Sequence, residues 1–288
     1  MTTRLARGRA RSGRGRARSA RYAGRRAGRS RYLGLLARAG FAARGVLYVI
    51  IGCIAVGIAF GRSSGQADSG GAVRVVAATP VGLVALWLLA AGFVGLALWR
   101  LAEAAFGGPG PGEQKAGSRL AALGKAVVYG ALAFTILKYA IGAGAPKSSN
   151  QQSTDLTASV LHHPGGQVVV VAVGFALVVG GAYVAYSSWR RDFLKQLNLT
   201  GASHQARRIV RWLGQVGGIA RGVVFAAVGV FLIVAGAKSQ PGQAKGLDST
   251  LRAFAQTPLG PWLLVVVALG LVTFGLYSCC EARWRKVS

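Results

Sequence analysis

Six separate apolar runs, each long enough or nearly long enough to cross a bilayer, constrain this chain more than any other feature. A bilayer core of about 30 Å requires about 20 helical residues. The chain is 52% hydrophobic and only 15% charged, which leaves too little polar surface for a water-soluble globule of 288 residues. We therefore predict an all-α polytopic membrane protein with six transmembrane helices, over Val46–Phe60, Val81–Trp99, Ala126–Ala145, Val168–Tyr186, Gly222–Ala237 and Leu263–Cys280. The first and fifth runs are slightly short, and we expect each to lengthen at its start.

The six runs form three copies of a two-helix unit. Each odd-numbered run opens with a cation, a small residue, Val, an aliphatic residue and an aromatic one. A proline precedes each even-numbered run, and an aromatic residue lies near the end of that run. Cations and amphipathic rings are typical of the membrane interface. We therefore predict six interface anchors, the cations Arg44, Lys125 and Arg221 and the aromatic residues Trp99, Tyr186 and Tyr277.

The repeat also predicts the arrangement of the copies. Because each unit has two spans, all three copies enter the membrane in the same direction, and we expect a pseudo-threefold axis roughly along the membrane normal. Inverted repeats of the kind found in transporters need an odd number of spans and are excluded. The predicted boundaries are residues 32–107, 120–197 and 213–287, after a disordered Arg-rich tail over residues 1–31.

The positive charges predict the orientation. With the N-terminus in the cytoplasm, the inside segments hold 28 Lys and Arg residues and the outside loops hold 6. Without the tail and the start of the first span, the split is still 14 to 6. The positive-inside rule therefore places both termini in the cytoplasm of a cell with this protein in its plasma membrane.

The segment Ala37–Tyr48, the segment Asp68–Arg74 with Thr79-Pro80, and their echoes in the later repeats resemble a known bacterial family. That family is catalogued only as domain of unknown function 1206 and consists of three two-helix repeats. The resemblance covers about residues 36–287, and the ending from Gly275 to Arg283 is also similar. It implies the fold and membrane location given above, and it implies no substrate, cofactor or catalytic residue.

Lys138 is the one cation inside a predicted span. A lysine at the middle of a bilayer costs about 2.5–3.5 kcal/mol on insertion scales, so its position requires a reason. One interpretation is an anion or proton site inside the helix bundle. The other, which we favour, is a side chain that snorkels to the outer headgroups, since no carboxylate lies within the spans at matching depth.

One acid in each outer loop, Asp68, Asp155 and Asp248, precedes the proline of its repeat by 9 to 12 residues. The simpler interpretation is that they cap short helices, and residues 248–254 fit an N-capped amphipathic helix. The alternative is a ring of carboxylates around an outer vestibule, as in cation-selective channels.

No catalytic, cofactor-binding or metal-binding motif is recognisable, so we expect neither an enzyme nor a cofactor. The tail's arginines favour contact with anionic lipids of the inner leaflet, and nucleic acid is an unlikely partner for a membrane-tethered segment with few aromatic residues. Two hypotheses for function remain. The first is a non-catalytic membrane protein that acts by packing, lipid contact or partner binding, and the second is a small channel or transporter along the pseudo-threefold axis.

Overall fold

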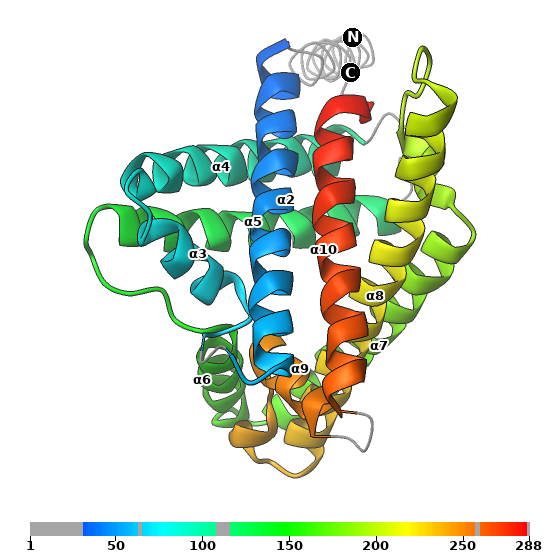
Figure 1. Cartoon of the computed structure of the whole chain (residues 1–288). Coiled ribbons are helices and arrows are strands. Elements are labelled where there is room, and N and C mark those ends of the chain that lie inside the picture. Colours follow the sequence, from blue (N-terminus) through cyan, green and yellow to red (C-terminus); the bar gives the residue numbers. More distant parts are fainter. Residues whose placement is uncertain (1–30, 63–64, 108–115, 257–259, 287–288) are drawn as a thin grey trace, which may run out of the picture.

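The computed structural model describes residues 31–62, 65–107, 116–256 and 260–286, so almost all of the predicted disordered tail lies outside the described residues. The described part is all-helical (Figure 1). Its α-helices are α2 (Arg31–Ala59), α3 (Ser69–Ala77), α4 (Gly82–Phe106), α5 (Ala116–Ala140), α6 (Ser149–Leu161), α7 (Gly166–Trp189), α8 (His204–Ala237), α9 (Leu247–Ala255) and α10 (Gly260–Trp284). Six of them are long and apolar enough to cross a membrane. The predicted fold class is confirmed, and the chain is a multi-pass membrane protein.

Each repeat consists of a long helix, a short helix and a second long helix. The short helices α3, α6 and α9 lie at one end of the bundle, and the connections from α4 to α5 and from α7 to α8 lie at the other (Figure 1). We name the first end the outer end and the second the inner end, after the orientation predicted from charge. The two short apolar runs extend at their starts as expected, since α2 and α8 begin well before Val46 and Gly222.

The long helices pack in a cyclic order. The second long helix of each repeat packs along the first long helix of the next, which pairs α4 with α5, α7 with α8, and α10 with α2. Figure 1 shows the α2–α10 pair standing side by side, with α4 and α5 running together across it. Within repeats, α2 also packs on α4 and α8 on α10, whereas α5 and α7 of the second repeat are not a closely packed pair among the described residues. This cyclic order is what parallel repeats around a pseudo-threefold axis require.

Glycines allow two of these pairs to approach closely at matching positions. A Cβ atom on Gly45 would lie 2.8 Å from the Gly275 carbonyl oxygen in α10, and one on Gly222 would lie 2.6 Å from the Gly181 carbonyl oxygen in α7. Gly52 and Gly229 repeat this geometry two turns further along α2 and α8. Small residues promote close contact of transmembrane helices, because backbones can then touch directly. The contacts therefore align α10 with α7 residue by residue.

Candidate functional site

Lys138 lies on the exposed surface of α5, with its Nζ atom 5.8 Å from the centre of the Phe134 ring. It is not among the residues that line the cavity described below. This position offers no anion or proton site inside the bundle. It is the position that a snorkelling lysine requires.

Asp68 is fully buried at the outer end, where it caps α3. Its Oδ1 atom accepts a hydrogen bond of 2.8 Å from the Gly71 backbone N–H. Its Oδ2 atom accepts bonds from the backbone N–H and the hydroxyl of Ser149, at 2.7 and 3.0 Å. The carboxylate thus joins the start of α6 in the second repeat to α3 in the first. Its oxygens are occupied by donors, which is the usual way a buried charge is stabilised.

Asp248 makes an equivalent link between other repeats. Its carboxylate accepts a bond of 2.8 Å from the Ala67 backbone N–H and pairs with Arg252 at 3.0 Å. The residue lies in the first turn of α9, as predicted, although the N-cap position belongs to Gly246. The Ser149 hydroxyl closes the cycle, because it accepts a bond of 3.0 Å from the Leu247 N–H.

Asp155 differs from the other two acids, because it is exposed and pairs with Lys147 at 2.6 Å. The three carboxylates therefore do not form a ring that faces an opening. Two of them fasten the outer helices of neighbouring repeats to one another, and the third is on the surface. The helix-capping interpretation describes Asp68, and the vestibule interpretation has no support in this geometry.

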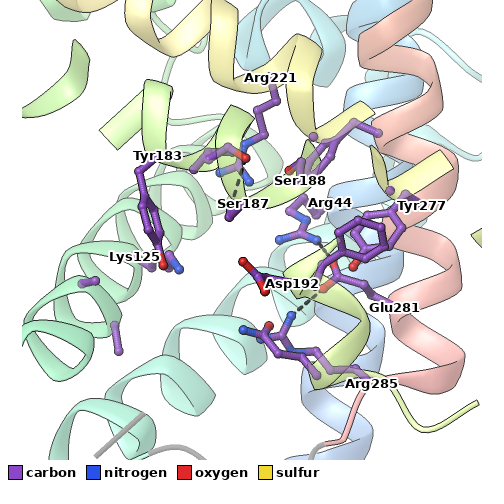
Figure 2. Close-up of a pocket in the computed structure, with 18 of the residues that line it drawn as sticks. Arg44, Lys125, Tyr183, Ser187, Ser188, Asp192, Arg221, Tyr277, Glu281 and Arg285 are labelled. Atoms are coloured by element: carbon purple, nitrogen blue, oxygen red, sulfur yellow. Dashed lines mark hydrogen bonds and ion pairs between the residues drawn. The ribbon is translucent and has the colours of Figure 1, made fainter. Parts of the chain in front are cut away.

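A cavity of about 340 Å³ lies at the inner end, between α5 and α7 (Figure 2). Five cations and three carboxylates contribute to its walls. The cations Arg44, Lys125 and Arg221 come from equivalent positions in the three repeats, and Arg100 and Arg285 add to them. The carboxylates belong to Glu103, Asp192 and Glu281. Positive charge is therefore in excess in a recess at the inner end of the spans.

Arg44 is only 5% exposed and lies inside a polar network. Its guanidinium group pairs with Glu281 and donates to the Ser278 hydroxyl at 3.1 Å and the Tyr129 hydroxyl at 3.2 Å. Arg285 pairs with the second oxygen of Glu281. Figure 2 shows Arg44, Glu281 and Arg285 together on one side of the cavity. The structure thus places Arg44 differently from the predicted headgroup anchor, because a buried carboxylate on α10 holds it within the protein.

The predicted aromatic anchors also differ from expectation. The Trp99 side chain is buried and packs edge-on against Phe41, with ring centres 5.4 Å apart. Tyr277 is buried and packs against Phe193 at 5.2 Å. Only Tyr186 is exposed, and its hydroxyl accepts a bond from Arg190. Two of the three rings therefore pack within the protein, because cavity arginines and neighbouring rings surround them.

Arg100 forms the second buried pair of the cavity. Its Nη1 atom lies 2.6 Å from Glu103, and its guanidinium group lies over the Trp99 ring at 4.4 Å. The Nε atom of Arg100 is buried and has no hydrogen-bond partner. This donor, on a side chain that is more than nine-tenths buried, is available to an acceptor that enters the cavity.

Arg221 has no carboxylate partner among the described residues. Three aromatic rings surround its guanidinium group, those of Phe225, Phe274 and Tyr48 at 4.7, 4.8 and 6.0 Å. Its Nε atom is buried without a hydrogen-bond partner. Lys125 also lacks an ion pair within the described part of the chain. The rings hold Arg221 in place by cation–π attraction while its charge stays unneutralised.

The second repeat explains why Arg221 is unpaired. The glycine contacts align Glu281 of α10 with Ser187 of α7, and each lies 23 residues after the proline of its repeat. Glu103 occupies the same position in the first repeat. All three residues line the cavity. The third repeat thus supplies a carboxylate to the next cation in the cycle, whereas the second repeat supplies a hydroxyl.

The same alignment corrects the choice of aromatic residue in the second repeat. Tyr183 lies 19 residues after Pro164, as Trp99 and Tyr277 do after Pro80 and Pro258. Tyr183 lines the cavity and Tyr186 does not. A constant spacing of 19 would have identified Tyr183 from the sequence. The acids Glu103 and Glu281 had the same kind of signal, a spacing of 23, and the sequence analysis missed them.

Asp192 lies where the 3₁₀ helix η1 (Asp192–Gln196) meets the cavity. A hydrogen bond of 2.6 Å from Lys195 holds the pKa of the Asp192 carboxyl below its usual range. This group therefore stays ionised at neutral pH, but its charge is already balanced by Lys195. It does not neutralise the unpaired cations of the cavity.

Comparison with known proteins supports the repeat architecture. The chain is 29% identical over 253 residues to the uncharacterized protein YxxB of Bacillus subtilis (strain 168), which covers 87% of this chain and 90% of the relative. No solved structure matches the chain significantly. The model of one family, described as Domain of Unknown Function (DUF1206), matches three successive segments, residues 39–107, 120–191 and 216–285. Each matched segment contains one cation of the cavity, and the chain belongs to this family of three-repeat membrane proteins.

Proposed function

We propose that this protein is a non-catalytic membrane protein that binds an anionic group in the inner cavity. The observation that carries the proposal is Arg221, a cation held by three rings beside a cavity and left without a counter-ion. Burying a charge without a partner is costly, so such a site is favourable when an anion completes it. Arginine suits this role, because its planar fork of donors matches carboxylate and phosphate oxygens.

The state of the cavity acids supports a binding role over catalysis. Glu103 is paired with Arg100, and Glu281 is paired with two arginines. A general base needs a carboxylate that can accept a proton near neutral pH. Carboxylates fixed by guanidinium groups are poorly suited to that task. They are well suited to holding the arginine cluster in one geometry.

Packing supports binding over conduction along the pseudo-threefold axis. Buried apolar side chains from α2, α4, α5 and α10 occupy the bundle between the inner cavity and the outer helices, among them Ile51, Phe93, Ile136 and Leu271. A conducting path needs polar groups or water along its length. No observation on the described residues favours a channel in particular.

The proposal includes the orientation and the tail. Both termini are in the cytoplasm, and the Arg-rich tail, which lies outside the described residues, contacts anionic lipids of the inner leaflet. The charge split of 28 to 6 supports this arrangement. A membrane-impermeant thiol reagent applied to intact cells should label Gln152→Cys in α6 and leave Gln205→Cys in α8 unlabelled, relative to the parent chain. The opposite labelling would overturn the orientation.

Anion binding is tested with inorganic phosphate on the purified protein in detergent. Phosphate should raise the unfolding temperature above that in chloride at equal ionic strength, because a ligand of the native state stabilises it. Arg221→Gln should abolish the phosphate-specific rise. Arg207→Gln, on the exposed start of the same helix, removes the same charge and should retain the rise. An equal response of Arg221→Gln and the parent protein would overturn the proposal.

A further inference from the structure

The second repeat leaves an opening in the side of the helix bundle. All buried positions of α7 fit contact with α8, and Gly174 and Gly181 among them touch α8 directly. A Cβ atom added at Gly130 of α5 or at Gly180 of α7 would meet nothing within 4 Å. The two spans of this repeat are therefore not closed against each other, whereas α2 packs on α4 and α8 packs on α10.

The inner cavity lies in this opening. Ser118 and Lys125 of α5 form part of its wall, and Tyr183 and Ser187 of α7 form another part. Lys125 and Tyr183 are both exposed, so the cavity reaches the surface between the two helices. Figure 2 shows Tyr183 beside Lys125, on the side of the cavity away from Glu281. A ligand can therefore enter sideways, from between α5 and α7.

Beyond the cavity, the surfaces beside the opening become apolar. Val128, one turn from Lys125 towards the outer end, is 57% exposed. Val179, one turn from Tyr183 in the same direction, is 51% exposed. The opening thus combines a basic recess at the inner end with hydrocarbon surfaces that continue into the bilayer. This is the polarity of an amphiphile that has an anionic head and apolar chains.

We propose that the cavity holds the phosphate of an anionic glycerophospholipid whose acyl chains lie between α5 and α7. This inference rests on the anion-binding function proposed above and names the ligand class. Arg221 and Lys125 supply the unpaired charges, and basic pockets between transmembrane helices are known to hold anionic lipid headgroups. A second copy of this chain is a poor occupant, because each copy carries a net charge of +28 and would bring more positive charge to a basic opening.

Ser187 is the residue that makes the site selective for an anion. A glutamate there, as at the equivalent positions Glu103 and Glu281, would pair with Arg221 and repel a phosphate. The serine hydroxyl leaves Arg221 free and adds one small donor to the wall. The substitution Ser187→Glu therefore restores the repeat pattern and removes the proposed site in a single step.

The experiment compares the full chain with Ser187→Glu and with the control Gln205→Glu, which adds the same charge on an exposed turn of α8. Each purified protein is incubated with mixed micelles of phosphatidylglycerol and phosphatidylcholine, and the retained lipid is measured by native mass spectrometry. The parent and Gln205→Glu should retain phosphatidylglycerol at least tenfold over phosphatidylcholine. Ser187→Glu should lose this preference while its unfolding temperature stays equal to or above that of the parent.

The outcomes separate this inference from the function on which it rests. If inorganic phosphate stabilises the parent but not Ser187→Glu, and no variant prefers phosphatidylglycerol, the lipid inference fails and the anion site stands. If neither phosphate nor phosphatidylglycerol distinguishes the parent from Ser187→Glu, both fail. A lipid-free dimer that Ser187→Glu disrupts would also overturn the lipid inference, because a second copy would then occupy the opening.

Discussion

The α10–α2 junction and the α7–α8 junction share a backbone arrangement and differ in their charges. In both, paired glycines bring two helices into direct contact at equivalent positions. At the first junction Arg44 meets Glu281, and at the second Arg221 has Ser187 at the corresponding position of α7. The comparison teaches that the repeat specifies helix packing. One residue in each copy then decides whether the cation of the next repeat is neutralised or left for a ligand.

Removal of each cation should break the comparison with the largest effect. Arg44→Gln should lower the free energy of unfolding by about 3–5 kcal/mol, since it leaves the buried Glu281 without one of its partners. Arg221→Gln should lower it by no more than about 2 kcal/mol, the strength of a desolvated cation–π contact. Chemical denaturation of each variant in the same detergent measures the difference.

A surface pair provides the control for these two substitutions. Asp155→Asn removes one charge from an exposed ion pair with Lys147 and should cost less than about 1 kcal/mol. Equal losses for Arg44→Gln and Arg221→Gln would contradict the distinction between a neutralised and an open junction.

Glycine substitutions should sharpen the contrast between the closed junctions and the open side of the second repeat. A Cβ atom at Gly52 would lie 2.5 Å from Val272 Cγ2 and 2.8 Å from the Ala268 carbonyl oxygen. Gly52→Ala should therefore cost about 1–3 kcal/mol, as overpacked sites do. Gly180→Ala meets no atom and should be neutral or stabilising by up to about 1 kcal/mol, because alanine favours the helix. Thermal unfolding of both variants tests this, and a loss at Gly180 equal to that at Gly52 would refute it.

The sequence was sufficient to predict the spans and the repeat, because both depend on local patterns. Apolar length determines which segments can cross a bilayer, and the recurring cation and proline mark the copies. The first and fifth spans lengthened at their starts, as their short apolar runs required. Even the cations of the cavity were identified as equivalent positions before their surroundings were known.

The cavity itself could not be predicted, because it depends on contacts between distant residues. Glu281 is 237 residues from Arg44 in the chain, and no local pattern joins them. Headgroup anchoring was the simplest interpretation of an arginine at a span boundary, and the buried carboxylate overrides it. The choice of Tyr186 over Tyr183 had a different cause, since a constant spacing was present in the sequence and was not used.

Lys138 provides the smallest expected effect and contrasts a surface cation with the buried ones. Lys138→Leu should leave the protein as stable or slightly more stable, because the side chain lies on the exposed surface of α5 and the substitution removes a desolvation cost. The contact with the Phe134 ring at 5.8 Å is the only loss, worth about 0.5–1 kcal/mol at an exposed site. Lys138→Arg keeps the charge and serves as the control in thermal unfolding measurements. A clear loss of stability in Lys138→Leu together with tolerance of Lys138→Arg would show that the cation has a partner. It would then belong with Arg44 as a structural charge rather than with the lipid-facing surface.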